Sequence, residues 1–319
     1  RIGAGEVEVE AEMSHAAADV IFRTLFSIPI EHEIAAQVFA QFRDYQRTQP
    51  LLNIAAFLPL PRFLPRGHRR RTKATARSIR DLITRLTEAR MAEIAAGTAP
   101  DDLATKIMTT PDPATGETFT TAEMVDQVAI FFLAGHETSA SALAWTLYLV
   151  ATHPDWQARL AEEAGALDSC DFKVMSKLKL SRDVFREALR LYPPVPMMVR
   201  ETTCPETFRG RDVKPGAQVV LSPWHLHRHT RIWDNPDGFD PARWQTEGGR
   251  DCMRRAYMPF SAGPRVCTGA GFAMVEGPLL LSMLLKRFRF EAVAGKTPVP
   301  VAHLTVRARD GIHLRVSPR

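Results

Sequence analysis

The sequence has few cysteines, and they do not form the patterns that build disulfide-rich or zinc-bound folds. Its 319 residues include Cys170, Cys204, Cys252 and Cys267, with no Cys-x-x-Cys pair. Wide spacing in a chain of this length argues against a disulfide framework and against a structural zinc site. We therefore expect a cytoplasmic, reducing environment.

Long apolar runs, targeting signals and repeats are also missing. No run of 18 apolar residues predicts a membrane span, and the first residues show no signal-peptide pattern. There is no internal repeat or low-complexity linker, so we expect one domain over 1–319, and the 45% hydrophobic content allows a sizeable core. Because the chain begins with Arg1, we expect an N-terminal portion to be missing.

Charge of one sign is only slightly in excess. The formal net charge is +5 and the sequence pI is about 9.2. Basic residues cluster between Arg66 and Arg80, but without the aromatic interleaving or known module that nucleic-acid binding requires. We expect a solvated helix start and no nucleic-acid partner, and the basic balance would favour an acidic protein partner.

Helical spacing dominates what is present, so we expect a mainly α fold with a small β-sheet. Pro29 divides 12–47 into two helices, and Gly97 closes a third that begins near Arg70. Thr120 and Glu123 have the spacing of a capping box for a helix of roughly 30 residues, which Pro154 stops. Other expected elements are a loop over 49–67, helices over 155–166, 181–191 and 271–288, strands over 197–201 and 218–221, and a hairpin over 304–316 that turns at 310–311.

The most informative segment is the loop Phe260-Ser-Ala-Gly-Pro-Arg-Val-Cys-Thr-Gly269. Its glycines at 263 and 269 permit unusual backbone angles and let a flat ligand approach closely. Arg265 offers a fork of donors suited to a carboxylate. Cys267 lies just before a helix, whose positive end favours a thiolate, and Phe260 would shield that sulfur from water.

This loop resembles the haem-binding signature of the cytochrome P450 family, Phe-x-x-Gly-x-Arg-x-Cys-x-Gly. The match is complete at Phe260, Gly263, Arg265, Cys267 and Gly269. The resemblance implies a haem-thiolate monooxygenase of the bacterial, soluble type, a P450-like fold that is N-terminally truncated, and haem b with Cys267 as the axial iron ligand. It also implies electrons from NAD(P)H that arrive through a separate ferredoxin, flavodoxin or reductase.

A set of charged residues also supports the resemblance. Glu187 and Arg190 match the family's Glu-x-x-Arg pair, and Arg243 matches its third partner, so the three are expected to form a buried salt-bridge triad that specifies the fold. Arg200 is expected to reach a haem propionate.

The segment Ala134-Gly-His-Glu-Thr138 resembles the family's oxygen-activation motif on the long central helix. Ala134 is small enough to leave room beside the haem. Glu137 and Thr138 are expected to be the catalytic pair that relays protons. Thr138 can also donate a hydrogen bond to the Ala134 carbonyl, which would open the helix locally.

Register with the family also nominates apolar positions that would face a hydrophobic small-molecule substrate. These are Ile130, Phe131, Val195, Met197, Leu304 and Thr305, in addition to Ala134.

Two other functions remain open. A hydroperoxide-using member of the family would often lack the acid–alcohol pair, so Glu137 and Thr138 argue against it. A non-catalytic or degenerate haem-binding fragment is the other alternative, because the family's N-terminal portion is expected to be missing. In the family that portion carries strands, a propionate-binding residue and a substrate-gating segment. The substrate itself is beyond the sequence.

Overall fold

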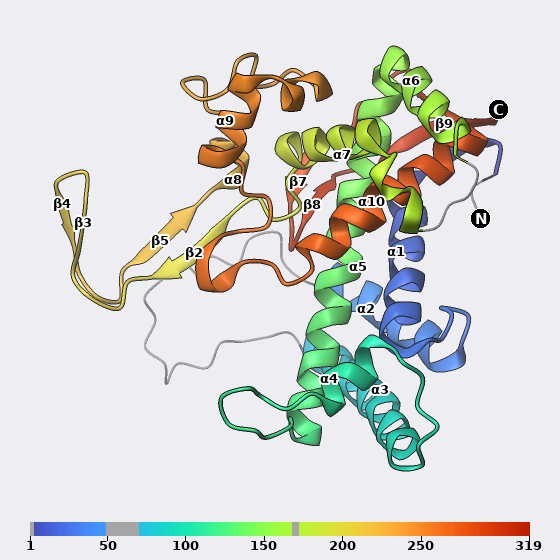
Figure 1. Cartoon of the computed structure of the whole chain (residues 1–319), viewed down its shortest axis with the longest axis vertical. Coiled ribbons are helices and arrows are strands. Elements are labelled where there is room, and N and C mark those ends of the chain that lie inside the picture. The colour runs from blue at the N-terminus through green and yellow to red at the C-terminus, as the bar shows by residue number, and fades with distance from the viewer. Residues whose placement is uncertain (1–2, 49–69, 168–171) are drawn as a thin grey trace. The chain divides into compact units, whose positions relative to one another are not determined.

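The computed structural model describes residues 3–48, 70–167 and 172–319 (Figure 1). The chain forms two compact units. The first unit consists of Arg1–Glu12 and Ser141–Arg319, and the second of Met13–Ala140. Helices α1 (Val9–Phe26) and α5 (Thr121–Thr152) each continue across a boundary between the units. The second unit is therefore an insertion in the chain of the first, joined to it through two helices.

The second unit is built from helices around an aromatic core. It contains most of α1, then α2 (Glu33–Thr48), α3 (Arg70–Ala95), α4 (Leu103–Thr109) and the first part of α5. Buried side chains from all five helices meet in one cluster, which includes Phe22, Phe42, Ile83 and Phe132. Gly135 permits a close approach of α5 to α1, because an added Cβ there would lie 2.5 Å from the side chain of Ile21.

A buried ion pair fixes the ends of three helices in this unit. Arg90, near the end of α3, is paired with Asp102, the residue that caps the start of α4. Arg90 also donates to the carbonyl of Phe26, the last residue of α1, at 2.8 Å. Burial raises the pKa of Asp102, but hydrogen bonds from Arg90, Thr105 and Ser27 outweigh it and hold that pKa below its ordinary value.

The first unit contains the remaining helices. They are the second part of α5, α6 (Pro154–Gly165), α7 (Lys179–Leu191), α8 (Pro223–Leu226), α9 (Glu247–Ala256) and α10 (Ala270–Arg287), with 3₁₀ turns at Phe172–Ser176, Pro241–Gln245 and Gly263–Arg265. Helix α10 packs against α6 and α7 (Figure 1). At the crossing with α7, an added Cβ on Gly277 would lie 2.3 Å from the ring of Phe185.

The described strands of the first unit form small antiparallel sheets. In the three-stranded sheet, β9 (His313–Pro318) lies between β1 (Gly5–Glu8) and β6 (Phe288–Ala292), and Gly5 is paired with Val316. The other pairs are β2 (Met198–Glu201) with β5 (Gln218–Leu221), β3 (Glu206–Phe208) with β4 (Arg211–Val213), and β7 (Pro300–Ala302) with β8 (Val306–Ala308).

The predicted mainly α architecture with little sheet is confirmed. The capping box is also present, since Thr120 donates through both its backbone and its hydroxyl to the carboxylate of Glu123, at 2.9 and 2.7 Å. Gly97 ends the third helix with a φ of +70°. The expected loop over 49–67 lies outside the described residues.

One element prediction is wrong. The chain does turn at Gly311, where φ is +77°, but the strands on either side of this turn do not pair with each other. Strand β8 pairs with β7, and β9 pairs with β1 and β6. The sequence therefore predicted both strands correctly but not their pairing, because each strand pairs with other segments of the chain.

Within the described parts of the chain, no helix combines the length and the apolar character needed to cross a bilayer.

Candidate functional site

The loop before α10 folds back on itself around Cys267. The backbone N–H of Cys267 donates to the carbonyl of Phe260 at 2.9 Å, and that of Val266 donates to Gly263 at 3.0 Å. Gly263 adopts a φ of +68°, a left-handed conformation that glycine accepts without strain. These contacts form a tight turn that carries the cysteine at its end.

The part of this turn that carries the Cys267 thiol is exposed to solvent. The side chain of Cys267 is exposed, as are Arg265 and Val266. An added Cβ on Gly269 would lie 3.8 Å from the Cys267 sulfur, so the glycine keeps the space beside the sulfur clear. The next residue, Ala270, begins an 18-residue helix, whose N-terminus favours negative charge nearby.

Strand β2 is tied to this turn through Arg200. Its guanidinium donates to the hydroxyl of Ser261 at 2.9 Å, while the Phe260 side chain is half-buried. The turn therefore lies within reach of two guanidinium groups, one from Arg200 on β2 and one from Arg265 within the turn itself. Two such groups beside an exposed thiol suit a ligand that carries carboxylates.

The three charged residues of the expected triad lie together in the first unit. Arg190 holds the Glu187 carboxylate through two hydrogen bonds of 3.0 and 2.8 Å, and Arg243 donates to it at 2.9 Å. Glu187 and Arg190 are fully buried, and Arg243 is 8% exposed. The remaining donors of both arginines are used by backbone carbonyls at positions 227, 234, 235, 236 and 238.

Every guanidinium nitrogen of Arg190 and Arg243 thus donates to an acceptor, which a buried set of charges requires. It also binds the irregular segment 227–243 to α7. Asp240 adds a backbone N–H to the Glu187 carboxylate at 3.1 Å. The triad consequently determines the path of a segment that has little regular structure of its own.

His227 extends this connection toward the thiol-bearing turn. Its Nδ1 lies 3.2 Å from the carbonyl of Arg190, and its Nε2 accepts the backbone N–H of Met258 at 2.9 Å. Burial lowers the pKa of His227 to about 4, so the ring is neutral and can accept that hydrogen bond. Nothing in the local sequence around His227 could have revealed Met258 as its partner, since the two residues lie 31 positions apart.

In the second unit, α5 presents one face with little cover. Ile130 is 58% exposed, Ala134 is exposed and Thr138 is half-buried, and these residues follow one another at four-residue intervals. The Thr138 hydroxyl donates to the Ala134 carbonyl at 2.7 Å, as the sequence predicts, but the expected local opening of the helix is wrong, since α5 is continuous through this point. Glu137 is 3% exposed and lies on the adjoining, covered side.

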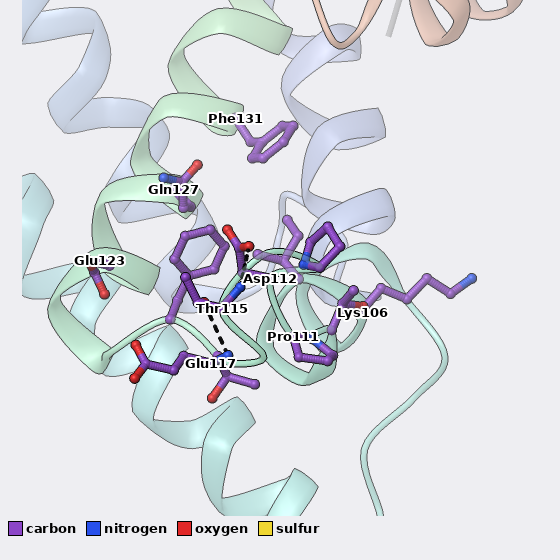
Figure 2. Close-up of a pocket in the computed structure, with 13 residues that line it drawn as sticks. Lys106, Pro111, Asp112, Thr115, Glu117, Glu123, Gln127 and Phe131 are labelled. Atoms are coloured by element: carbon purple, nitrogen blue, oxygen red, sulfur yellow. Dashed lines mark hydrogen bonds between the residues drawn. The ribbon is translucent and has the colours of Figure 1, made fainter.

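A cavity lies at the start of α5 in the same unit (Figure 2). Its volume is about 590 Å³, and Phe131 and Gln127 line it from α5, while Lys106, Asp112 and further residues line it from α4 and the loop that follows. Phe131 is half-buried. The substrate-facing position expected at Phe131 thus contributes to a charged and apolar surface cavity.

The other expected substrate-facing residues belong to two segments that the first unit brings together. The backbone N–H of Val306 donates to the carbonyl of Pro194 at 2.9 Å, which joins the segment after α7 to β8. A second cavity of about 280 Å³ lies here, lined by Met197 and Val306 among others. Val195 is half-buried and Leu304 is 55% exposed, whereas Thr305 is buried at 2%.

Comparison with known proteins identifies the family. The family model described as "Cytochrome P450" matches residues 2–315. The chain belongs to the cytochrome P450 family.

Its similarity to individual members covers parts of different length. Cytochrome P450 4A10 of Mus musculus is 36% identical over 206 residues, which is 63% of this chain and 40% of that protein. Protein LUTEIN DEFICIENT 5, chloroplastic, of Arabidopsis thaliana is 34% identical over 213 residues, 65% of this chain and 36% of that protein. The alignments therefore span about two fifths of the length of these curated relatives.

Solved structures agree in fold over almost the whole chain. A mutant of the cytochrome P450DA heme domain has a TM-score of 0.85 at 27% identity and covers 98% of this chain and 69% of that chain. The cytochrome P450 CYP102L1 has a TM-score of 0.82 at 26% identity, with 99% and 73% covered.

The family uses haem b as its cofactor, and the thiol-bearing turn fits such a group. Cys267 offers an exposed sulfur donor, and the position of an added Cβ on Gly269 has only that sulfur within 4 Å. At Gly263 and Gly271 an added Cβ would meet nothing within 4 Å. An exposed soft donor, open glycines and nearby guanidinium groups form the donor set that a thiolate-bound haem with propionates needs.

Proposed function

We propose that this chain is the catalytic domain of a haem-thiolate monooxygenase that acts as a single domain over 1–319. It inserts one oxygen atom of dioxygen into an apolar small molecule and releases the other as water. The observation that carries this proposal is the position of Cys267, exposed at the end of a hydrogen-bonded turn in front of α10. Membership of the cytochrome P450 family supports it.

In this proposal the residues of the turn would hold the haem. Cys267 would bind the iron through its sulfur, Gly263 and Gly269 would allow the ring to approach the backbone, and Arg265 and Arg200 would bind propionates. When bound, the haem iron supplies the activation of dioxygen. Support for the turn as a rigid cradle comes from the Cys267 N–H···Phe260 hydrogen bond and from the link between Arg200 and Ser261.

Residues of α5 would manage protons and space. Ala134 leaves room beside the haem because its side chain is a methyl group. Thr138 orients its hydroxyl through the hydrogen bond to the Ala134 carbonyl, so its oxygen remains free to accept a hydrogen bond from water. Glu137, buried one position earlier, is the acid that holds a proton and releases it to this hydroxyl–water path.

The substrate would be apolar and would lie against Ile130, Phe131, Val195, Met197 and Leu304, with Thr305 as a buried neighbour. Most of these side chains are apolar, which favours hydrophobic ligands. Electrons from NAD(P)H would arrive through a separate ferredoxin, flavodoxin or reductase. A cytoplasmic location stays a prediction from cysteine usage.

The test is the spectrum of the reduced protein with carbon monoxide. Cys267→Ala is expected to remove the band typical of thiolate ligation, while Cys204→Ala, which changes another exposed cysteine of the first unit, is expected to leave it intact. Persistence of the band in Cys267→Ala would overturn the assignment of the ligand. Turnover with peroxide alone would favour the hydroperoxide-using function, and failure of the unaltered chain to bind haem would favour the non-catalytic fragment.

A further inference from the structure

The second cavity of the first unit has a polar corner that the function so far does not use. The volume of this cavity is about 280 Å³, and Ser222 and His225 contribute its polar side chains. Most of the lining is apolar and includes Pro196, Met197, Trp224 and Pro300. Among the described residues that line it there is no lysine, arginine, aspartate or glutamate, so the cavity suits a neutral ligand.

The hydrogen bonds of Ser222 define what each nitrogen of the His225 ring can do. The Ser222 hydroxyl lies 3.1 Å from the carbonyl oxygen of Pro196 and 2.8 Å from Nδ1 of His225. The assignment that satisfies both contacts has the hydroxyl donate to the carbonyl, which can only accept, and accept from Nδ1. In the neutral ring this leaves a lone pair on Nε2, which has no hydrogen-bond partner among the described residues.

The aromatic wall beside this pair is held by contacts outside the cavity. The guanidinium of Arg228 lies 3.9 Å from the centroid of the Trp224 ring, and the ring of Tyr192 meets that ring edge-on with centroids 6.0 Å apart. The backbone N–H of Trp224 donates to the Pro196 carbonyl at 3.3 Å. A fixed, flat wall suits a flat ligand, and the thioether of Met197 is a favourable neighbour for an aromatic ring.

Strand β2 connects this cavity to the thiol-bearing turn within the first unit. Met197 lines the cavity directly before β2 begins, and Arg200 on the same strand donates to Ser261 of the turn. In extended chain, three residues separate the Cα positions of Met197 and Arg200 by about 10 Å. The cavity and the turn are therefore neighbours along one strand, at a distance that an elongated molecule can span.

We propose that this cavity binds the phenol end of an elongated apolar substrate, whose hydroxyl donates a hydrogen bond to Nε2 of His225. His225 is then a specificity-determining residue, and Ser222 is a positioning residue that holds the imidazole in the accepting tautomer. This inference rests on the proposed function, for which it names a substrate class. The flat wall favours a phenol over an alkyl alcohol, and the lack of lysine and arginine in the described lining favours it over a carboxylate.

Two isomeric probes separate the hydrogen bond from the fit of the apolar body. The compounds para-butylphenol and para-propylanisole have the same atomic composition and the same aromatic ring, but only the phenol can donate a hydrogen bond. By calorimetry, the haem-loaded chain is expected to bind the phenol about tenfold more tightly than the ether, which is the upper range for one net hydrogen bond. Equal affinity for the two probes, or no binding of the phenol, would overturn the inference.

Substitutions at the exposed His225 assign this preference to one side chain. His225→Phe keeps an aromatic ring but has no acceptor, so the phenol and the ether are expected to bind equally. His225→Gln places an amide oxygen at the distance of Nε2 and is expected to keep part of the preference. His229→Phe changes another exposed histidine, one that does not line the cavity, and is expected to keep all of it. An unchanged preference in His225→Phe would contradict the assignment.

The second readout observes the nitrogen itself. In the reduced, carbon monoxide-bound protein, which is diamagnetic, the nitrogen NMR signal of His225 Nε2 is assigned by its loss in His225→Phe. The phenol is expected to shift this signal and the ether to leave it in place. In Ser222→Ala, where Nδ1 loses its acceptor, the preference for the phenol is expected to fall severalfold. A signal that the phenol does not move would exclude Nε2 as the acceptor.

These outcomes are distinct from a failure of the proposed function. If the carbon monoxide band of thiolate ligation is present and the preference for the phenol is absent, the inference is wrong while the proposed function stands. If the chain prefers the phenol but binds no haem, the binding site is supported and the monooxygenase function is overturned.

Discussion

At the scale of single residues, the hydroxyl of Thr138 is the most exposed group of the proposed relay. Its hydrogen bond to the Ala134 carbonyl fixes the direction of the oxygen. We expect Thr138→Ala to retain haem and substrate binding but to raise the share of electrons lost as peroxide severalfold, because proton delivery by a positioned group is lost.

The matched control is Thr138→Ser, which keeps the hydroxyl and its hydrogen bond. Peroxide release and oxygen consumption, measured together, give the coupling of electrons to product. Equal coupling in the Ala and Ser variants would remove the Thr138 hydroxyl from the relay.

The free energy of unfolding should depend on pH through the buried side chain of His227. Its pKa is about 4 in the folded protein, because burial disfavours the charged ring, against an ordinary value near 6.5. Between these values the unfolded state binds more protons, so this contribution to stability is complete above pH 6.5 and is lost as the pH falls toward 4. The loss amounts to at most about 3 kcal/mol.

His227→Gln is the comparison, since its amide oxygen lies at the distance of Nε2 and can accept from Met258 without titrating in this range. Denaturant unfolding at pH 7, 5.5 and 4 is expected to show a smaller decrease in free energy for the variant. Identical pH dependence of the two proteins would show that His227 does not titrate with a depressed pKa.

Individual site residues differ in how far the sequence reveals them. Cys267, Arg265 and the two glycines were recognisable because a continuous loop carries them at fixed spacing. The ring contacts of His136 with Phe39 and Phe42 were not recognisable from the sequence. These phenylalanines lie almost a hundred residues earlier, and no local pattern predicts a contact over that separation.

At the scale of secondary structure elements, the buried pair of Arg90 and Asp102 holds α1, α3 and α4 at one place. We expect Arg90→Ala to lower the free energy of unfolding by about 3 kcal/mol, since it leaves Asp102 buried without its cation. Arg80→Ala on the same helix is the control, because Arg80 and its partner Asp126 are both about half exposed, and such a pair contributes under about 1 kcal/mol. Equal losses in the two variants would contradict the importance of burial.

Elements with a local cause were the predictable ones. The capping box of Thr120 and Glu123 and the glycine at 97 act within a few residues, so the sequence alone defined both helix ends. The hairpin expected over 304–316 was wrong because strand pairing is a long-range choice: β9 takes β1 as a neighbour, some 300 residues earlier. Short strands such as β1 and β3 also carry too few residues for a clear alternation.

At the scale of the whole molecule, the insertion of Met13–Ala140 into the first unit determines how unfolding can be observed. All five tryptophans, at 145, 156, 224, 233 and 244, belong to the first unit. The boundaries fall inside the continuous helices α1 and α5, so melting of one unit interrupts helices of the other. The boundaries between the units could not be predicted, because neither helix carries a glycine- or proline-rich linker at the boundary.

We therefore expect one cooperative transition, as for a single domain. Tryptophan fluorescence should follow the same denaturant midpoint as circular dichroism, and Arg90→Ala, a change in the second unit, should lower the tryptophan midpoint as well. A tryptophan transition unmoved by Arg90→Ala would show two independently folding units.

The crossing of α7 and α10 has a consequence of another kind. Since Gly277 has no side chain, the Phe185 ring sits where a methyl group would otherwise stand. The spacing of these two helices is thus defined by a missing carbon atom, and Glu187 lies on one helix while the turn of Cys267 leads into the other. An alanine at 277 would push the two helices apart. It would thereby move the triad of Glu187 away from the sulfur of Cys267, although the new methyl group would touch neither.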